Sequence, residues 1–133
     1  MTSEWFAYAL DPVRFATERL GLQPDPKQAL VLSRAVSRGL LNCTRQWGKS
    51  TITAANAVHR AVFEDASLTV VLTPSARQSG EFLRKAADFL KLLDIRPRGD
   101  GDNEISLLFP NGSRIIGLPG KIGRAPVCNA VQL

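Results

Sequence analysis

Apolar and polar residues follow two different periods along this chain, and each change of period marks a predicted element. In 76–93 the apolar residues recur at helical spacing, which predicts an amphipathic helix. The stretch 67–73 is instead β-branched and apolar, which is typical of a strand in a parallel sheet. The face of the helix that we expect to be buried carries Phe82, Leu83, Ala86, Phe89, Leu90 and Leu93. The opposite face carries most of the charges, namely Arg84, Lys85, Asp88 and Lys91.

Two helices are predicted near the start of the chain, over 12–20 and 26–38. Asp11 and Asp25 precede them, and an aspartate at this place can accept a hydrogen bond from the first helical turn. Each aspartate is followed by a proline, whose fixed φ suits the first helical position, and each predicted helix is followed by a glycine.

The rest of the pattern predicts a buried strand at 40–43, an alanine-rich helix from 48 or 49 to 63, and a β-hairpin. The hairpin consists of 104–109 and 114–118, because an Asn-Gly pair between two β runs is a strong turn signal. The stretch 96–103 has the composition of a loop. Strands that alternate with helices predict an α/β domain with a mostly parallel sheet.

Length and composition indicate one domain. The chain has 133 residues, of which 44% are hydrophobic and 22% charged, an ordinary globular composition. No apolar run approaches the roughly 18–20 residues of a membrane span, and no secretory signal pattern opens the chain. Cys43 and Cys128 match no metal-binding spacing. We therefore expect a cytoplasmic protein with no membrane contact.

Charge adds two observations. The net charge is +5, and Lys27, Arg34 and Arg38 would share one face of the second predicted helix. Such a stripe is either a solvated face or a contact with nucleic-acid phosphates. In addition, 105–133 contains no Asp or Glu.

The segment 43–51 carries the chemistry. It contains Gly-Lys-Ser after a predicted strand and at the start of a predicted helix, which is the setting of a phosphate-binding loop. Gly48 would let the backbone approach a phosphate, Lys49 would reach the β- and γ-phosphates, and the Ser50 hydroxyl would bind Mg²⁺. Cys43 stands where the full pattern has glycine, so a loop with a solvated lysine is the alternative.

Arg45 would place a second cation beside the phosphates. It is a candidate catalytic or charge-sensing group, in a role comparable to an arginine finger, or else an ordinary surface ion pair. Arg45 and Lys49 are thus the catalytic candidates. Trp47 is better explained as a packing residue of the loop.

With these residues in view, the chain resembles the N-terminal ATPase domain of the large subunit of tailed-phage terminases, the motors that package viral DNA. Four blocks carry the resemblance, in the family's order: Pro24 to Gln28, Thr44 to Thr51, Val70 to Ser79 and Phe109 to Gly120. The resemblance implies a P-loop NTPase core of the ASCE or RecA-like type, with ATP and Mg²⁺ as cofactors and Gln28 as the residue that recognises adenine. The residues implied to contact the nucleotide are Gln28, Thr44, Arg45, Gln46, Trp47, Gly48, Lys49, Ser50 and Thr51.

The resemblance also implies partners and a domain plan. The partners would be double-stranded DNA, a terminase small subunit and a portal, in the cytoplasm of a bacterial host. The plan is 1–38 for the N-terminal helices, 39–120 for the P-loop core and 121–133 for a divergent tail. The tail shows no clear period, and the family's nuclease domain is absent.

The family's next strand, which ends in the Walker B acids, is also missing. ATP hydrolysis needs one carboxylate to hold Mg²⁺ and another to orient water. We therefore expect a truncated, hydrolysis-deficient ATPase fragment, such as a prophage remnant or frameshifted product. An exposed sheet edge would then favour self-association. The alternatives are the front part of a helicase-like ATPase, a non-catalytic nucleotide- or DNA-binding remnant and, less well matched, a small kinase.

Overall fold

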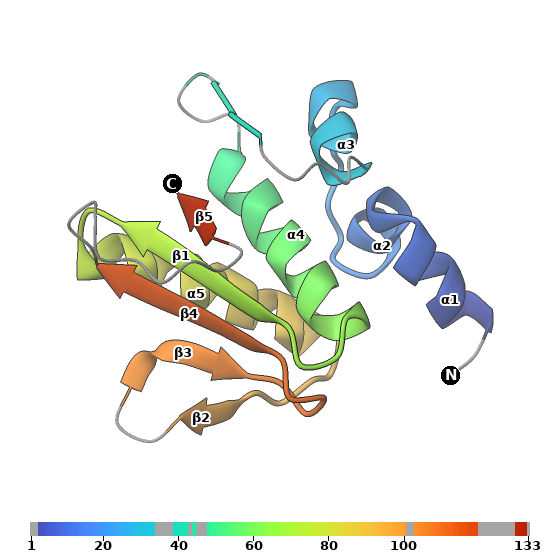
Figure 1. Cartoon of the computed structure of the whole chain (residues 1–133). Helices are drawn as coiled ribbons and strands as arrows, with labels where there is room; N and C mark the ends of the chain where they lie inside the picture. Colours follow the sequence, from blue (N-terminus) through green and yellow to red (C-terminus); the bar gives the residue numbers. More distant parts are fainter. Residues whose placement is uncertain are drawn as a thin grey trace.

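The computed structural model describes residues 3–33, 39–42, 44, 48–100, 103–119 and 130–132, and these form an α/β fold (Figure 1). The helices of the described residues are α1 (Ser3–Leu10), α2 (Pro12–Glu18), α3 (Pro26–Ser33), α4 (Lys49–Phe63) and α5 (Ala76–Leu92). The strands are β1 (Leu68–Thr73), β2 (Arg98–Asp100), β3 (Asn103–Leu108), β4 (Arg114–Pro119) and β5 (Ala130–Gln132).

One mixed sheet joins the strands in the order β2-β3-β4-β1-β5. β1 is parallel to β4 on one side and to β5 on the other. β3 is antiparallel to both β4 and β2. The α/β class, the strand at β1 and the β3–β4 hairpin are therefore confirmed, whereas the parallel part of the sheet is limited to three strands.

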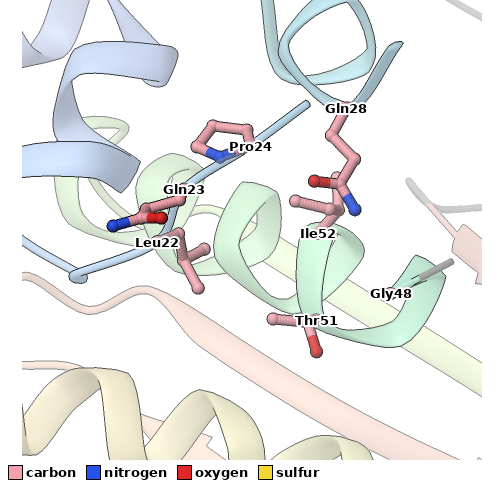
Figure 2. A pocket seen from close by; sticks show the side chains of 7 residues that line it. All are labelled: Leu22, Gln23, Pro24, Gln28, Gly48, Thr51 and Ile52. Carbon is pink, nitrogen blue, oxygen red and sulfur yellow. The ribbon is translucent and has the colours of Figure 1, made fainter. Parts of the chain in front are cut away.

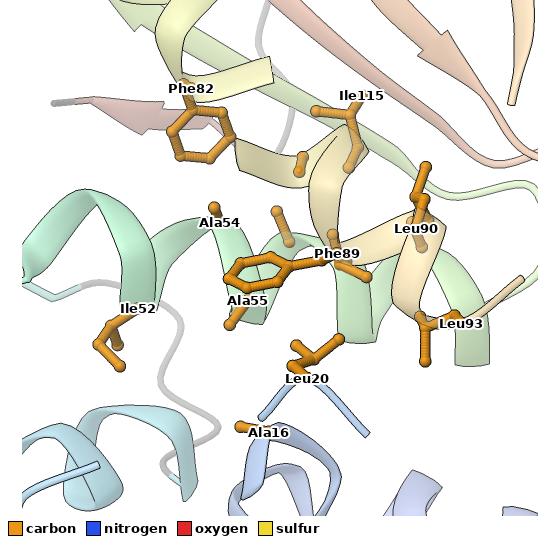
Figure 3. Packing of buried hydrophobic residues seen from close by; sticks show 14 of the residues in the cluster. Ala16, Leu20, Ile52, Ala54, Ala55, Phe82, Phe89, Leu90, Leu93 and Ile115 are labelled. Carbon is orange, nitrogen blue, oxygen red and sulfur yellow. The ribbon is translucent and has the colours of Figure 1, made fainter. Parts of the chain in front are cut away.

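The core lies between the sheet and the helices α4 and α5. Val71 of β1 and Ile115 of β4 are fully buried in one cluster with residues of both helices. Figure 3 shows Phe82 and Phe89 of α5 on the alanine-rich side of α4, where small side chains leave room for the rings. All six residues of the predicted apolar face of α5 are buried, as its helical period requires.

α5 approaches β4 closely at Gly117. A Cβ added to this glycine would lie 2.9 Å from the Cβ of Ser79, which is itself fully buried. The Ser79 hydroxyl is hydrogen-bonded to the hydroxyl of Thr73 at the end of β1. A residue without a side chain is therefore needed at 117 for this packing distance.

The hairpin turn holds the C-terminal end of α4. The Asn111 side-chain nitrogen donates to the carbonyl of Ala61 (2.8 Å), and the Ser113 hydroxyl donates to the carbonyl of Glu64 (2.8 Å). The Ser113 oxygen also accepts from the amide of Ser67, just before β1 (3.2 Å). Carbonyls that a helix end leaves without partners are thus satisfied by a turn some fifty residues later in the chain.

The N-terminal helices pack on α4 through aromatic rings. Phe15 of α2 lies edge-on to Phe63 at 5.3 Å between centroids, and Trp5 of α1 lies edge-on to Phe63 at 5.4 Å. The predicted start of α2 is confirmed, because Asp11 accepts a hydrogen bond from the amide of Arg14 (3.1 Å). α1 is an element that the sequence analysis missed.

Several predictions fail or lie outside the described residues. Residues 39–42 form no strand, and the Leu40 side chain is 89% exposed. A strand needs a neighbour, and β1 is already paired with β4 and, over Val70–Leu72, with β5. Cys43 and 34–38, with Arg34 and Arg38, lie outside the described residues, so the basic stripe stays a prediction.

The strands β2 and β5 correct two further predictions. β2 occupies a stretch predicted as loop, because pairing with β3 overrides its turn-rich composition. β5 arises in the tail, where no element was predicted, and pairs with part of the β1 edge that we expected to be exposed. In the part of the chain that the structure describes, no helix is both long and apolar enough to cross a membrane.

We predict that Gly117→Ala destabilises the fold by about 1–3 kcal/mol, because the new methyl group meets Ser79 in a packed core. Gly80→Ala on α5 is the matched control. A Cβ there has nothing within 4 Å, so alanine should stabilise the helix by roughly 0.5–1 kcal/mol. Urea unfolding of the two variants measures both effects. Equal stabilities would contradict the close approach of α5 to β4.

His59 on α4 predicts a pH dependence of stability. Its Nε2 donates to the Tyr8 carbonyl (2.9 Å), and its ring lies 5.2 Å from Phe15 and 4.8 Å from Phe63 between centroids. Burial lowers the pKa of His59 below its ordinary value of 6.5.

Below about pH 6.5 the unfolded chain therefore binds a proton that the folded chain does not, and folding stability falls as the pH drops. His59→Gln should reduce the slope of unfolding free energy between pH 5 and 7. Urea unfolding at several pH values measures it, and an unchanged slope in the variant would count against a half-buried, neutral imidazole at His59.

Candidate functional site

The candidate site is built around the N-terminal end of α4. Gly48 precedes the helix with φ +86° and ψ 24°, a left-handed conformation that glycine adopts at little cost. Its carbonyl accepts from the amide of Ile52 (2.9 Å), which begins the helical hydrogen-bond pattern. Glycine has no side chain that could cap the helix, and the helix dipole favours an anion at this end.

A pocket of about 260 Å³ opens beside this helix start (Figure 2). One wall comes from the connection between α2 and α3 and the first turn of α3, and the other from the start of α4. The lining residues are Leu22, Gln23, Pro24, Gln28, Gly48, Thr51 and Ile52. The volume is slightly below the range of about 300–1,000 Å³ that is usual for ligand pockets, so it suits a part of a ligand, such as one ring system.

Gln28 is positioned by a reciprocal hydrogen-bond pair at the start of α3. The Gln28 amide donates to Asp25 Oδ1 (2.8 Å), and the Asp25 amide donates to Gln28 Oε1 (3.0 Å). This is a capping box, which fixes both side chains. The Gln28 side-chain nitrogen then lies beside Gly48, 3.2 Å from where a Cβ on Gly48 would be.

The structure thus brings together three of the residues predicted from sequence. Gln28, Gly48 and Thr51 line the pocket, although Gln28 is twenty positions before Gly48. Lys49 and Ser50 are half-buried in the first turn of α4, next to Gly48. Thr44 is exposed and does not line this pocket, whereas Arg45, Gln46 and Trp47 lie outside the described residues and stay predictions.

Sequence reasoning did not single out Leu22, Gln23 or Ile52. Ile52 follows Gly48 by four positions and therefore lies on the same side of the helix start. Leu22 is an apolar residue in a connection between helices, where a solvent-exposed side chain would be polar more often. These two signals identify the apolar walls only when the contact between the two segments is already known.

The donor set for Mg²⁺ is incomplete in the described residues. They contain no cluster of three or more His, Cys, Asp or Glu side chains. The Ser50 hydroxyl is the predicted ligand, and Mg²⁺ bound there would draw its other ligands from phosphates and water. Glu64 and Asp65 follow α4 at its far end, about 22 Å from Gly48 for a helix of 15 residues.

Comparison with known proteins identifies no relative: no protein-family model and no curated protein matches the chain.

Proposed function

We propose that this chain binds a nucleoside triphosphate, with the phosphates at the start of α4 and the base in the neighbouring pocket. The observation that carries the proposal is the position of Gln28 beside Gly48 across one pocket. The Gly-Lys-Ser segment predicted Gly48 as a phosphate contact, and the family resemblance implied Gln28 as the base contact. Their meeting at a left-handed glycine before a helix start supports a nucleotide site.

Within this proposal each residue has a chemical task. The amides that follow Gly48 bind phosphate oxygens, and the Lys49 ammonium neutralises the β- and γ-phosphates. The Ser50 hydroxyl is a ligand of the Mg²⁺ that accompanies ATP. Arg45 adds a second cation near the phosphates, as a charge sensor or catalytic group.

We further propose that the chain is related to the ATPase domain of terminase large subunits and has a partial P-loop NTPase core of the ASCE or RecA-like type. Parallel pairing of β1 with β4 and a helix that starts within the Gly-Lys-Ser segment, at Lys49, support this relationship. The described residues depart from such a core, because 39–42 form no strand before the loop and the sheet is mixed, with β3 antiparallel to β2 and β4. Double-stranded DNA, a small subunit and a portal would be the partners of the full motor in a bacterial host.

A non-catalytic nucleotide-binding protein is the second candidate function. The observation in its favour is that 105–133 contains no Asp or Glu and that the described residues form no acidic cluster. The two candidates share the binding site and differ in hydrolysis, so binding and turnover are tested separately.

Lys49→Ala should weaken ATP binding about ten- to hundredfold, because each hydrogen bond from a charged donor contributes roughly 1.5–3 kcal/mol. Isothermal titration calorimetry with and without Mg²⁺ measures the change. Lys85→Ala is the matched control, since Lys85 lies on the exposed face of α5 and should leave the affinity unchanged. Equal affinities of the Lys49 variant and the unsubstituted chain would exclude the phosphate loop.

We predict that the purified 133-residue chain shows no steady ATP turnover above a protein-free blank. The physical reason is that the described residues form no acidic cluster, and that Glu64 and Asp65 lie at the far end of α4 from the helix start. A phosphate-release assay measures the rate. Turnover that Lys49→Ala abolishes would contradict this prediction and favour an active ATPase.

A further inference from the structure

Thr53 is a buried polar residue in the second turn of α4. It is 8% exposed, and its neighbours Ala54 and Ala57 belong to the hydrophobic core cluster. Its hydroxyl donates to the carbonyl of Lys49 at 2.8 Å and, at the longer distance of 3.2 Å, to the carbonyl of Ser50. The hydroxyl is therefore directed back at the first turn of the helix.

Threonine is not the residue that helix stability alone would favour at position 53. Its β-branched side chain has a lower helix propensity than alanine. A hydroxyl that bonds the carbonyl four residues earlier also tends to bend a helix and to destabilise it slightly. Alanine or valine would fill this buried position without a polar atom that needs a partner. The effect of the hydroxyl on the first turn offers a reason for threonine that stability does not.

The two carbonyls that Thr53 contacts belong to peptide groups at the start of α4. A hydrogen bond donated to a peptide oxygen polarises the conjugated group and makes its N–H a stronger donor, by about 10–30% per bond. The Lys49 carbonyl shares its peptide group with the Ser50 amide, and the Ser50 carbonyl shares its group with the Thr51 amide. Both amides precede that of Ile52, with which the helical hydrogen-bond pattern begins.

We infer that Thr53 is a positioning residue of the proposed nucleotide site, which acts through the backbone by strengthening the Ser50 and Thr51 amides as donors to phosphate. This inference rests on the proposed function and adds to it a residue that does not line the pocket. The Ser50 amide gains more than the Thr51 amide, because the contact with the Lys49 carbonyl is the shorter one. The gain concerns the phosphates, so it is the same for any ligand that carries them.

Thr53→Val removes the hydroxyl and nearly keeps the shape of the side chain. We expect inorganic tripolyphosphate and ATP to bind about two- to tenfold more weakly, because the charge-assisted hydrogen bonds from the two amides lose about 10–30% of their strength. Isothermal titration calorimetry without Mg²⁺ measures the change and leaves out the metal that the Ser50 hydroxyl would bind.

Thr17→Val is the matched control for this substitution. The Thr17 hydroxyl makes the same kind of contact, to the carbonyl of Val13 at 2.9 Å, but it does so on α2. The same chemical change at this helix should leave both affinities unchanged.

Two further measurements separate this role from a merely structural one. Thr53→Ser keeps the hydroxyl and loses a buried methyl group, so it should be less stable in urea and still bind tripolyphosphate within about twofold of the unsubstituted chain. Thr53→Val should be at least as stable as that chain and yet bind more weakly. In ¹⁵N–¹H spectra, the shift that tripolyphosphate induces at the Ser50 amide proton should shrink in Thr53→Val, and by more than the shift at Thr51.

The possible outcomes separate this inference from the proposed function. Unchanged affinities in Thr53→Val, together with the loss expected in Lys49→Ala, would overturn the inference and leave the proposed function standing. Affinities that follow stability, falling in Thr53→Ser and holding in Thr53→Val, would also overturn it, because the hydroxyl would then have only a packing role. Failure of both ATP and tripolyphosphate to bind the unsubstituted chain would overturn the proposed function itself.

Discussion

The hydrogen bonds between the hairpin turn and the end of α4 determine where the rest of the molecule lies. Asn111 and Ser113 satisfy carbonyls at the C-terminal end of α4, and Ser113 also binds the backbone that leads into β1. Ser113 is fully buried, so each of these polar groups would be costly without its partner. One turn therefore sets the axis of α4 relative to the sheet, and with it the position of Gly48 at the other end of the helix.

A second constraint acts near the N-terminal end of α4. There, hydrogen bonds between close neighbours in sequence position Gln28 beside Gly48, which is distant in sequence. The capping box between Asp25 and Gln28 belongs to the first turn of α3. The capping box holds the Gln28 side chain so that its amide nitrogen lies beside Gly48, twenty positions later in the chain. The same pair of hydrogen bonds thus stabilises the start of α3 and holds the Gln28 side chain at the pocket.

We propose a nucleotide site that holds the groups needed for binding, and the described residues form no acidic cluster beside it. Binding needs a helix start, a cation and an apolar pocket, all of which the described residues provide close to Gly48. Hydrolysis needs carboxylates near the same phosphates. Glu64 and Asp65 lie beyond the far end of α4, and this separation along a rigid helix gives the distinction its physical basis.

The sequence by itself determined those features that depend on neighbouring residues. Asp11 caps α2 as its local pattern predicts, α5 buries the face that its period defines, and the Asn-Gly turn joins the two hairpin strands. Such features need only a few successive residues, because the hydrogen bonds and the helical period are local. The phosphate-loop residues and Gln28 were likewise chosen from sequence, the latter through a family resemblance.

Only the tertiary structure decided which segments meet. Leu40 lies in an apolar run but forms no strand, because β4 and β5 take the places beside β1. α1 is held by the contact of the Trp5 ring with the Phe63 ring of α4. β5 is held by its pairing with Val70–Leu72 of β1. The same holds for the pocket: no local pattern places Leu22 and Ile52 on facing walls, or Gln28 beside Gly48. Strand pairing and pocket walls are contacts between distant segments, so their energies depend on packing that a linear pattern does not contain.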